Sequence, residues 1–176
     1  MNKKEYIKNK VRNKKYINHD LCSTCIQPCC KLSGCDALPF DVIPFTQENI
    51  IKLIDNGIYS ITYTFTYDRR VIPVLRSREI DAGIFNFSDD HKGCSLLGEH
   101  GCTLTEDKRP SLALLLIPRV NPFHKKWRIC KSLVKTREFI KMWDKVSDIM
   151  EDVVEHYTGG KDFETLFMEY CKSEKN

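Results

Sequence analysis

The chain lacks any hydrophobic run long enough to cross a lipid bilayer. Its longest apolar run, residues 112–117, ends at Pro118, whereas a transmembrane helix needs about 20 apolar residues. The first residues also lack the apolar stretch of a secretory signal. We therefore expect a cytoplasmic protein with no membrane span.

Two common enzyme signatures are missing as well. The sequence holds no glycine-rich phosphate loop and no nucleophile elbow of a serine hydrolase. Hydrophobic residues make up 41% of the chain and charged residues 30%, which is typical of a folded domain. With 176 residues, one domain can bury a core without disulfides. The composition leaves open whether the chain is an enzyme.

Positive charge is concentrated at the N-terminus. Residues 1–20 hold seven Lys and Arg side chains against Glu5 and Asp20, a net charge of +5, so the rest of this +4 chain sums to −1. Because the body is not uniformly basic and shows no arginine- and aromatic-rich basic face, we do not expect nucleic acid as a partner. A basic arm that touches phosphates stays an alternative. We expect this arm or helix over 1–20 and a single cysteine-cluster domain over 21–176.

Local patterns predict an α+β fold in which C-terminal helices cover a small antiparallel sheet and cysteine-rich metal-binding loops. Thr46 is a suitable N-cap for a short helix that ends near Gly57. Apolar and polar residues alternate over 59–67, as in a half-buried strand. The remaining elements that we expect are an edge strand over 71–78, a third strand over 84–87, two short arms over 93–104, a helix over 110–117, a long helix over 132–157 capped by Gly159, and a last helix after Asp162.

Nine cysteines set this sequence apart. Cytosolic reductants keep ordinary thiols reduced, so clustered cysteines in such a chain indicate metal or redox chemistry rather than disulfides. A pair separated by two residues can bring two sulfurs to one ion. The candidate metal ligands are Cys22, Cys25, Cys29, Cys30, Cys35, Cys94, Cys102 and Cys130. We interpret Cys171, near the end of the last helix, as a packing thiol.

The spacing leaves several ligand sets open. Cys29 and Cys30 point to opposite sides of an extended segment, so they either serve two metals or one of them faces the core. Eight thiolates fill two zinc sites, or four hold an iron–sulfur cluster while the others are structural. His91 and His100 lie near Cys94 and Cys102, and either could replace a cysteine.

These residues resemble the zinc- or iron-chelating cysteine-cluster family, which is named for a C-x2-C-x3-C-C opening. The opening is Cys22-x2-Cys25-x3-Cys29-Cys30. It is followed by Cys94, by Gly101-Cys102-Thr103-Leu104 and by Arg109-Pro110, in the family's order. One departure stands out: Ala113 occupies the position of the family cysteine after Arg-Pro. Cys130 or Cys35 could supply the missing ligand, or one site is incomplete.

The resemblance implies a metal-binding protein of undefined cellular role, with zinc or iron as cofactor. Some larger relatives resemble flagellin lysine methylases, so an iron–sulfur redox or methyl-transfer enzyme is the alternative, although no methyl-donor motif is evident. A second alternative is an adaptor that is stabilised by metal and contacts nucleic acid through its basic arm. The sequence does not indicate a protein partner.

Overall fold

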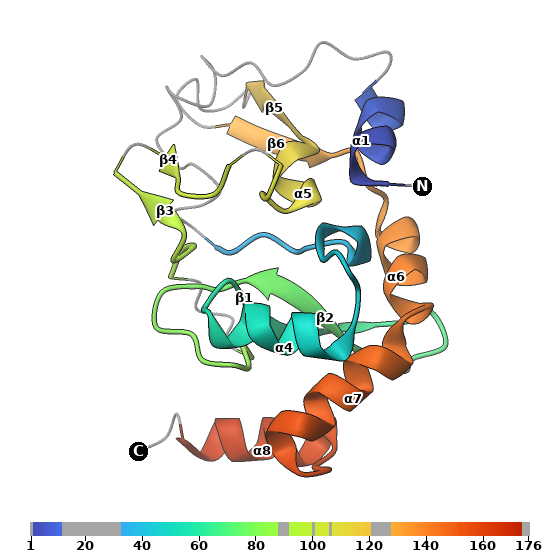
Figure 1. Ribbon diagram of the computed structural model, residues 1–176, viewed down its shortest axis with the longest axis vertical. Helices are drawn as coiled ribbons and strands as arrows, with labels where there is room; N and C mark the ends of the chain where they lie inside the picture. Colours follow the sequence, from blue (N-terminus) through green and yellow to red (C-terminus); the bar gives the residue numbers. More distant parts are fainter. Residues whose placement is uncertain are drawn as a thin grey trace.

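The described chain combines helices with short antiparallel ladders, which confirms the α+β fold class (Figure 1). The computed structural model describes residues 2–11, 33–87, 92–99, 101–105, 107–120 and 128–173. Its elements are α1 (Lys3–Val11), η1 (Pro39–Asp41), α4 (Gln47–Asp55), β1 (Tyr59–Phe65), β2 (Val71–Ser77), β3 (Leu97–Gly98), β4 (Gly101–Cys102), α5 (Ser111–Leu114), β5 (Leu116–Val120), β6 (Arg128–Ser132), α6 (Thr136–Asp144), α7 (Ser147–Thr158) and α8 (Phe163–Ser173).

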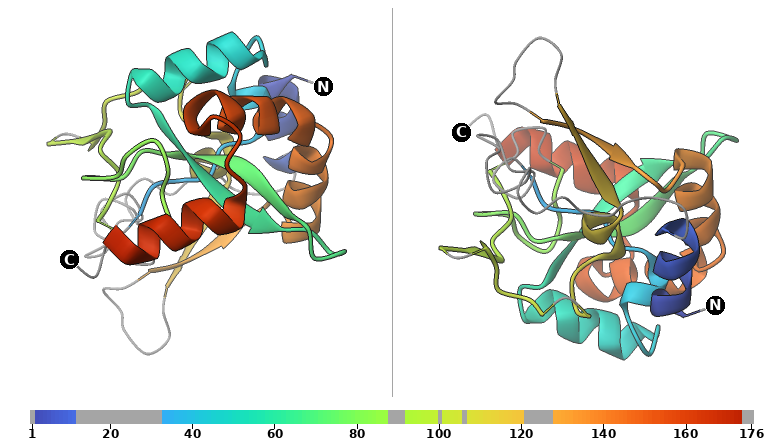
Figure 2. Two further views of the ribbon diagram at one scale, coloured as in Figure 1. Left: turned by 90° about the horizontal axis from the view of Figure 1, so that it is seen from below. Right: turned by 90° about the horizontal axis from the view of Figure 1, so that it is seen from above.

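The main core forms around the β1–β2 ladder. The strands pair antiparallel from Tyr59 opposite Ser77 to Phe65 opposite Val71. In both views of Figure 2 this ladder lies between α4 on one side and α8 on the other. The fully buried members of the core include Ile54 of α4, Ile61 of β1 and Trp143 of α6. Burial of such large apolar side chains is the main force that holds these layers together.

A second, smaller core lies between the N-terminal helix and the β5–β6 hairpin. Tyr6, Leu38, Leu115 and Val134 are buried there. The Tyr6 hydroxyl donates a hydrogen bond of 2.8 Å to the Glu138 carboxylate, so α1 is fixed to α6 as well. In the ranges that the structure covers, no helix is both long and apolar enough to cross a membrane.

Local capping signals were predicted well from the sequence. The Thr46 side chain accepts a hydrogen bond from the Asn49 N–H, which starts α4. Gly57 and Gly159 have φ angles of 73° and 64°, the left-handed conformation that ends a helix. The Asp162 carboxylate accepts a hydrogen bond of 2.8 Å from the Thr165 N–H at the start of α8. These contacts confirm the predicted helix ends.

Three predicted elements differ from the structure. The helix predicted over 132–157 is two helices, α6 and α7, with a break at Lys145 and Val146. The helix predicted over 110–117 ends at Leu114, and Pro118 lies inside β5 opposite Cys130 instead of stopping a helix. The strand predicted over 84–87 is reduced to a single parallel bridge between Phe85 and Ile61.

The aromatic row of β1 is only partly core. Tyr59 is buried and Tyr63 packs against the main core, as the alternating pattern predicts. Phe65 and Tyr67, at the tip of the β1–β2 hairpin, are each 67% exposed. The helices that bury Tyr59 and Tyr63 do not cover the hairpin tip. The alternating sequence pattern does not show where this burial ends.

Candidate metal centre

The predicted ligands divide into those that the structure describes and those that it does not. Cys22, Cys25, Cys29 and Cys30, together with His91 and His100, lie outside the described residues. Cys130 belongs to β6, where its backbone pairs with Pro118, but its side chain is outside the described part. The cysteines with described side chains are Cys35, Cys94, Cys102 and Cys171, and of these Cys94, Cys102 and Cys171 are free thiols.

Cys94 and Cys102 approach each other across the β3–β4 hairpin. Leu97 pairs with Cys102, and the Leu97 N–H donates to the Cys94 carbonyl, so the turn brings the two cysteines near each other at the hairpin base. Burial is the largest cause that raises the pKa of the Cys94 thiol, and the negative charges of Cys102 and Glu79 raise this pKa further. Hydrogen bonds from the Leu96 backbone and the Ser77 side chain act against that rise.

This electrostatic environment favours a protonated Cys94 thiol unless a cation is close. A thiol whose pKa is raised by burial and by neighbouring negative charges ionises poorly at neutral pH. A divalent cation between Cys94 and Cys102 would reverse the effect, since it stabilises both thiolates and binds as their protons leave. The pair therefore has the chemistry of half of a thiolate metal site.

The segment that contains Gly34 and Cys35 is hydrogen-bonded to the end of β2, near Cys94. Residues 34–37 run along β2: the Ala37 N–H donates to the Leu75 carbonyl, and the Ser77 N–H donates to the Cys35 carbonyl, both at 2.9 Å. The fit is tight at Gly34, where an added Cβ would lie 2.1 Å from the Ser77 carbonyl oxygen. Cys35 is thus held by its backbone at the same serine that hydrogen-bonds the Cys94 thiol.

Glu79 is a site residue that the sequence reasoning missed. Its side chain is 3% exposed, and its Oε1 accepts a hydrogen bond of 2.9 Å from the Gly34 N–H. The same oxygen lies 3.9 Å from the Arg76 guanidinium, and the Glu79 backbone forms a bridge with Cys94. No motif marks this residue. The only available signal was a glutamate that directly follows a strand rich in apolar residues.

The two later motifs of the resemblance contact each other. The Arg109 Nε donates a hydrogen bond of 3.0 Å to the Leu104 carbonyl, two residues after Cys102. The Arg109 carbonyl in turn accepts a hydrogen bond from the Lys3 ammonium group. The Arg-Pro segment therefore positions the loop that carries Cys102 and ties it to α1. Ala113, which stands where the family has a cysteine, lies within α5.

The described side chains alone do not make a complete metal site. Within the ranges given above, no three Cys, His, Asp or Glu residues are grouped closely enough to hold a metal ion. Cys35 interacts electrostatically with Arg76 and Tyr59. Cys171 lies on α8 next to Tyr170, which contacts Phe87. A tetrahedral zinc site needs four ligands, of which Cys94 and Cys102 would supply at most two.

Comparisons with known proteins add no assignment. No family model, no curated protein and no solved structure matches the chain. The cysteine-cluster resemblance stays a prediction that rests on the residues themselves.

Proposed function

We propose that the chain is a metal-binding protein in which cysteine thiolates hold zinc or iron. In this proposal Cys22, Cys25 and one of Cys29 and Cys30 form one side of the site, and Cys94 and Cys102 close it. The observation that carries the proposal is the proximity of the buried Cys94 thiol to the half-buried Cys102, whose charge raises the pKa of Cys94. The two thiols share one hairpin base, beside the point where the chain arrives from the cysteine-rich opening.

Chain length supports a meeting of the two halves. Cys30 precedes Gly34 by four residues, and four extended residues span at most about 14 Å. Gly34 is itself fixed to Glu79, whose backbone pairs with Cys94. The chain between Cys30 and Gly34 is therefore long enough for Cys29 or Cys30 to join Cys94 and Cys102 in one site.

Charge near the hairpin is compatible with such a site. Four thiolates around Zn²⁺ leave a net charge of −2, which nearby cations stabilise. The Arg76 guanidinium forms an ion pair of 2.6 Å with Asp36 and also lies near Glu79. Burial opposes the charge of Arg76, but the charge of Asp36 and its hydrogen bond raise the pKa, so the cation persists beside the segment that carries Cys35.

The roles of Cys35 and Cys130 belong to the same proposal. Either Cys130 or Cys35 replaces the ligand that Ala113 cannot provide, or one site is incomplete. The proposal also places the protein in the cytoplasm, because thiols stay reduced and available for metal in that compartment.

Anaerobic purification followed by metal analysis and an absorption spectrum tests the proposal. We expect stoichiometric zinc or iron in the unaltered chain, and a lower metal content in the Cys22→Ser and Cys102→Ser variants, since each removes a ligand. Cys171→Ser is the matched control and should keep its metal. Unchanged stoichiometry in Cys22→Ser and Cys102→Ser would refute the assignment.

The same spectrum separates the metal alternatives. A colourless protein with zinc identifies a zinc site and excludes the iron–sulfur enzyme. A brown protein that contains iron and acid-labile sulfide would favour that enzyme instead.

A further inference from the structure

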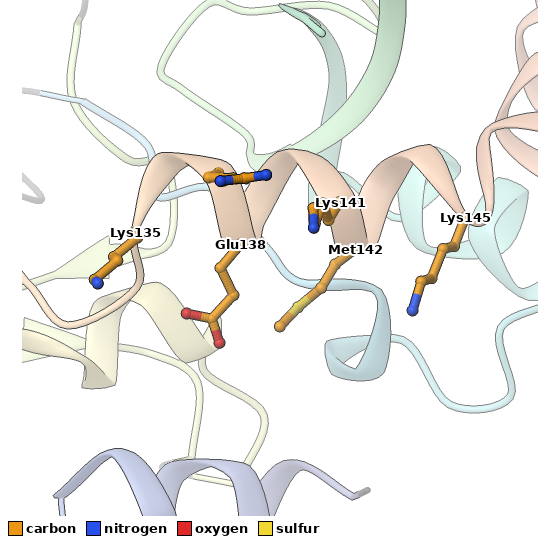
Figure 3. Close-up of a pocket in the computed structure, with 6 residues that line it drawn as sticks. Lys135, Glu138, Lys141, Met142 and Lys145 are labelled. Atoms are coloured by element: carbon orange, nitrogen blue, oxygen red, sulfur yellow. The ribbon is translucent and has the colours of Figure 1, made fainter. Parts of the chain in front are cut away.

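A trough lined by cations runs along α6. We name it the α6 trough, with a volume of about 560 Å³. Figure 3 shows several of its side chains pointing to the same side of the helix. Its lining residues are Lys135, Arg137, Glu138, Lys141, Met142 and Lys145. Four of the six are basic, and those four are exposed.

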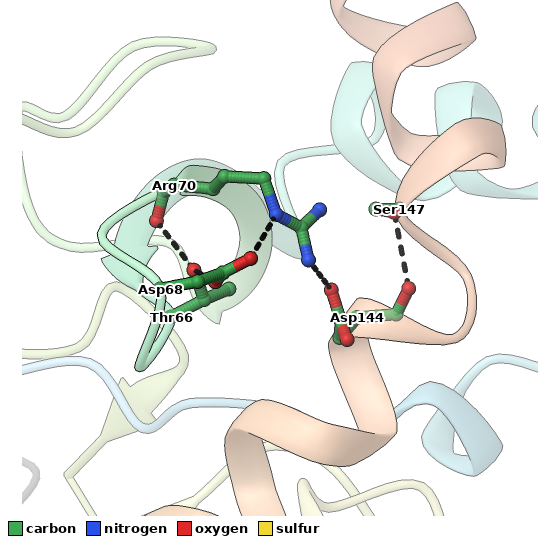
Figure 4. Close-up of polar contacts among 5 residues, drawn as sticks. All are labelled: Thr66, Asp68, Arg70, Asp144 and Ser147. Carbon is green, nitrogen blue, oxygen red and sulfur yellow. Dashed lines mark hydrogen bonds and ion pairs between the residues drawn. The ribbon is translucent and has the colours of Figure 1, made fainter.

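The acidic residues of α6 are paired with cations from other elements. The Glu138 carboxylate forms an ion pair with the Lys10 ammonium group of α1. Asp144 forms an ion pair of 2.8 Å with Arg70 from the β1–β2 turn (Figure 4). Among the described residues, no ion pair involves Lys135, Arg137, Lys141 or Lys145. The positive charges of these four side chains can therefore bind an external anion.

The spacing of these cations is regular. Arg137, Lys141 and Lys145 are separated by four residues, or about 6 Å along a helix axis, and lie on neighbouring turns of one face. This row is about 12 Å long, and Lys135, the N-cap of α6, lies outside it. A row of separate positive charges in a concave trough suits a linear polyanion. A flat anionic membrane would favour a helix that also presents a large apolar face.

Two exposed aromatic residues belong to the hairpin whose turn contacts the C-terminal end of α6. Arg70, which pairs with Asp144 beside Lys145, belongs to the turn that follows Phe65 and Tyr67. Both aromatic residues are 67% exposed. Sites for single-stranded nucleic acid combine a basic groove for the backbone with aromatic side chains on which bases stack. The hairpin tip and the α6 trough together offer both parts.

We propose that the α6 trough binds the phosphate backbone of single-stranded nucleic acid, and that Tyr67 and Phe65 stack with its bases. This inference does not rest on the cysteine site. It differs from the expectation drawn from the sequence, where the charge of −1 summed over residues 21–176 spoke against nucleic acid. A summed charge does not show that Glu138 and Asp144 of α6 are paired with Lys10 and Arg70 from other elements. It also does not show that Arg137, Lys141 and Lys145 lie on neighbouring turns.

Fluorescence anisotropy with a fluorescein-labelled oligothymidylate of about 15 nucleotides tests this proposal, using the full chain as purified. Each phosphate contact contributes about 0.7 to the slope of log affinity against log salt for single strands. In Lys141→Gln/Lys145→Gln the slope should therefore fall by about 1.4, and the affinity at about 0.1 M salt should fall by about 25-fold.

Two further variants sharpen the test. Lys52→Gln/Lys108→Gln removes the same charge from exposed positions outside the trough and should change the affinity far less. Tyr67→Ala should weaken binding by about tenfold without changing the salt slope, because stacking releases no counterions. This response distinguishes nucleic acid from a polyanion that binds by charge alone.

Several results would overturn the proposal. It fails if the oligonucleotide does not bind at about 50 mM salt, where phosphate contacts are strong. It also fails if the trough variant and the Lys52→Gln/Lys108→Gln control lose affinity equally. Binding to phosphatidylserine vesicles that is lost in the trough variant, without binding to the oligonucleotide, would assign the surface to a membrane instead.

Discussion

Asp41 joins three segments of the chain through one buried carboxylate, whose side chain is 0% exposed. It accepts hydrogen bonds of 2.8 Å from the N–H groups of Leu38 and Ser111, and a further one from the Ser111 hydroxyl. The Lys3 ammonium group lies 3.1 Å away and is itself only 12% exposed. The carboxylate thus connects α1, η1 and the start of α5.

Replacing this carboxylate should destabilise the fold strongly. Asp41→Asn keeps the shape of the side chain but removes its charge, so Lys3 is left without a counter-ion in a largely buried position. Removing one partner of a buried ion pair costs about 3–5 kcal/mol. Lys3 also donates to the carbonyls of Asp107 and Arg109, which offsets part of that loss. We therefore expect a decrease of about 3 kcal/mol in the free energy of unfolding.

Urea unfolding followed by circular dichroism measures this change, and a double-mutant cycle with Lys3→Met isolates the pair. We expect a coupling energy of about 1–3 kcal/mol between the two positions. Asp68→Asn is a matched control: Asp68 is 61% exposed and pairs with Arg70 on the surface, so its loss should change stability much less. A decrease below about 1 kcal/mol for Asp41→Asn, or a coupling near zero, would refute the reasoning.

Two further predictions concern the cysteine region and the aromatic core. Gly34→Ala should destabilise the protein by about 1–3 kcal/mol and lower its metal content, because the new Cβ would meet the Ser77 carbonyl at 2.1 Å. In Gly83→Ala an added Cβ meets nothing within 4 Å, so this variant should keep both its stability and its metal content. Equal losses of stability in Gly34→Ala and Gly83→Ala would contradict the prediction. Burial raises the pKa of Tyr63 to about 12, so the folded state holds this proton more tightly than the unfolded chain. The contribution of the neutral Tyr63 hydroxyl to the free energy of unfolding should be fully present below about pH 10 and should decrease as the pH rises towards about 12. Thermal unfolding of Tyr63→Phe over that range should show a weaker fall, and identical curves for both proteins would disprove it.

Elements with local signals were predictable from the sequence. Thr46, Gly159 and Asp162 mark helix ends by hydrogen bonding or backbone conformation within their own segments, and the structure places helix ends there. The alternating pattern of β1 was recognisable for the same reason, since a strand has a period of two residues.

Elements that depend on distant partners were not predictable. Pro118 ends a helix in many sequences, but here residues 116–120 pair with 128–132, which a local pattern does not reveal. The apolar spacing continues across the break between α6 and α7. At that break Arg70 pairs with the Asp144 carboxylate, while the Ser147 hydroxyl donates to the Asp144 carbonyl (Figure 4). Arg70 comes from a hairpin that is remote in sequence.

The candidate site shows the same division. The approach of Cys94 to Cys102 follows from a short hairpin and was predicted as two arms around a turn. The burial of Glu79 beside them depends on the docking of Gly34 onto β2. That contact joins residues 45 positions apart, and no spacing rule indicates it.

The segment between Val11 and Ser33, which contains the cysteine-rich opening, is attached to the body at both of its ends. α1 is held by the pairs of Lys3 with Asp41 and of Lys10 with Glu138, and Gly34 is held by Glu79. Residues 12–32 therefore connect two fixed ends, so the entropy of closing that loop is a cost that folding meets once. In polymer terms, any ligand that the proposed site takes from these residues is linked to Cys94 through the chain. Its meeting with Cys94 then depends on an effective concentration set by the length of the tether, not on the concentration of the protein.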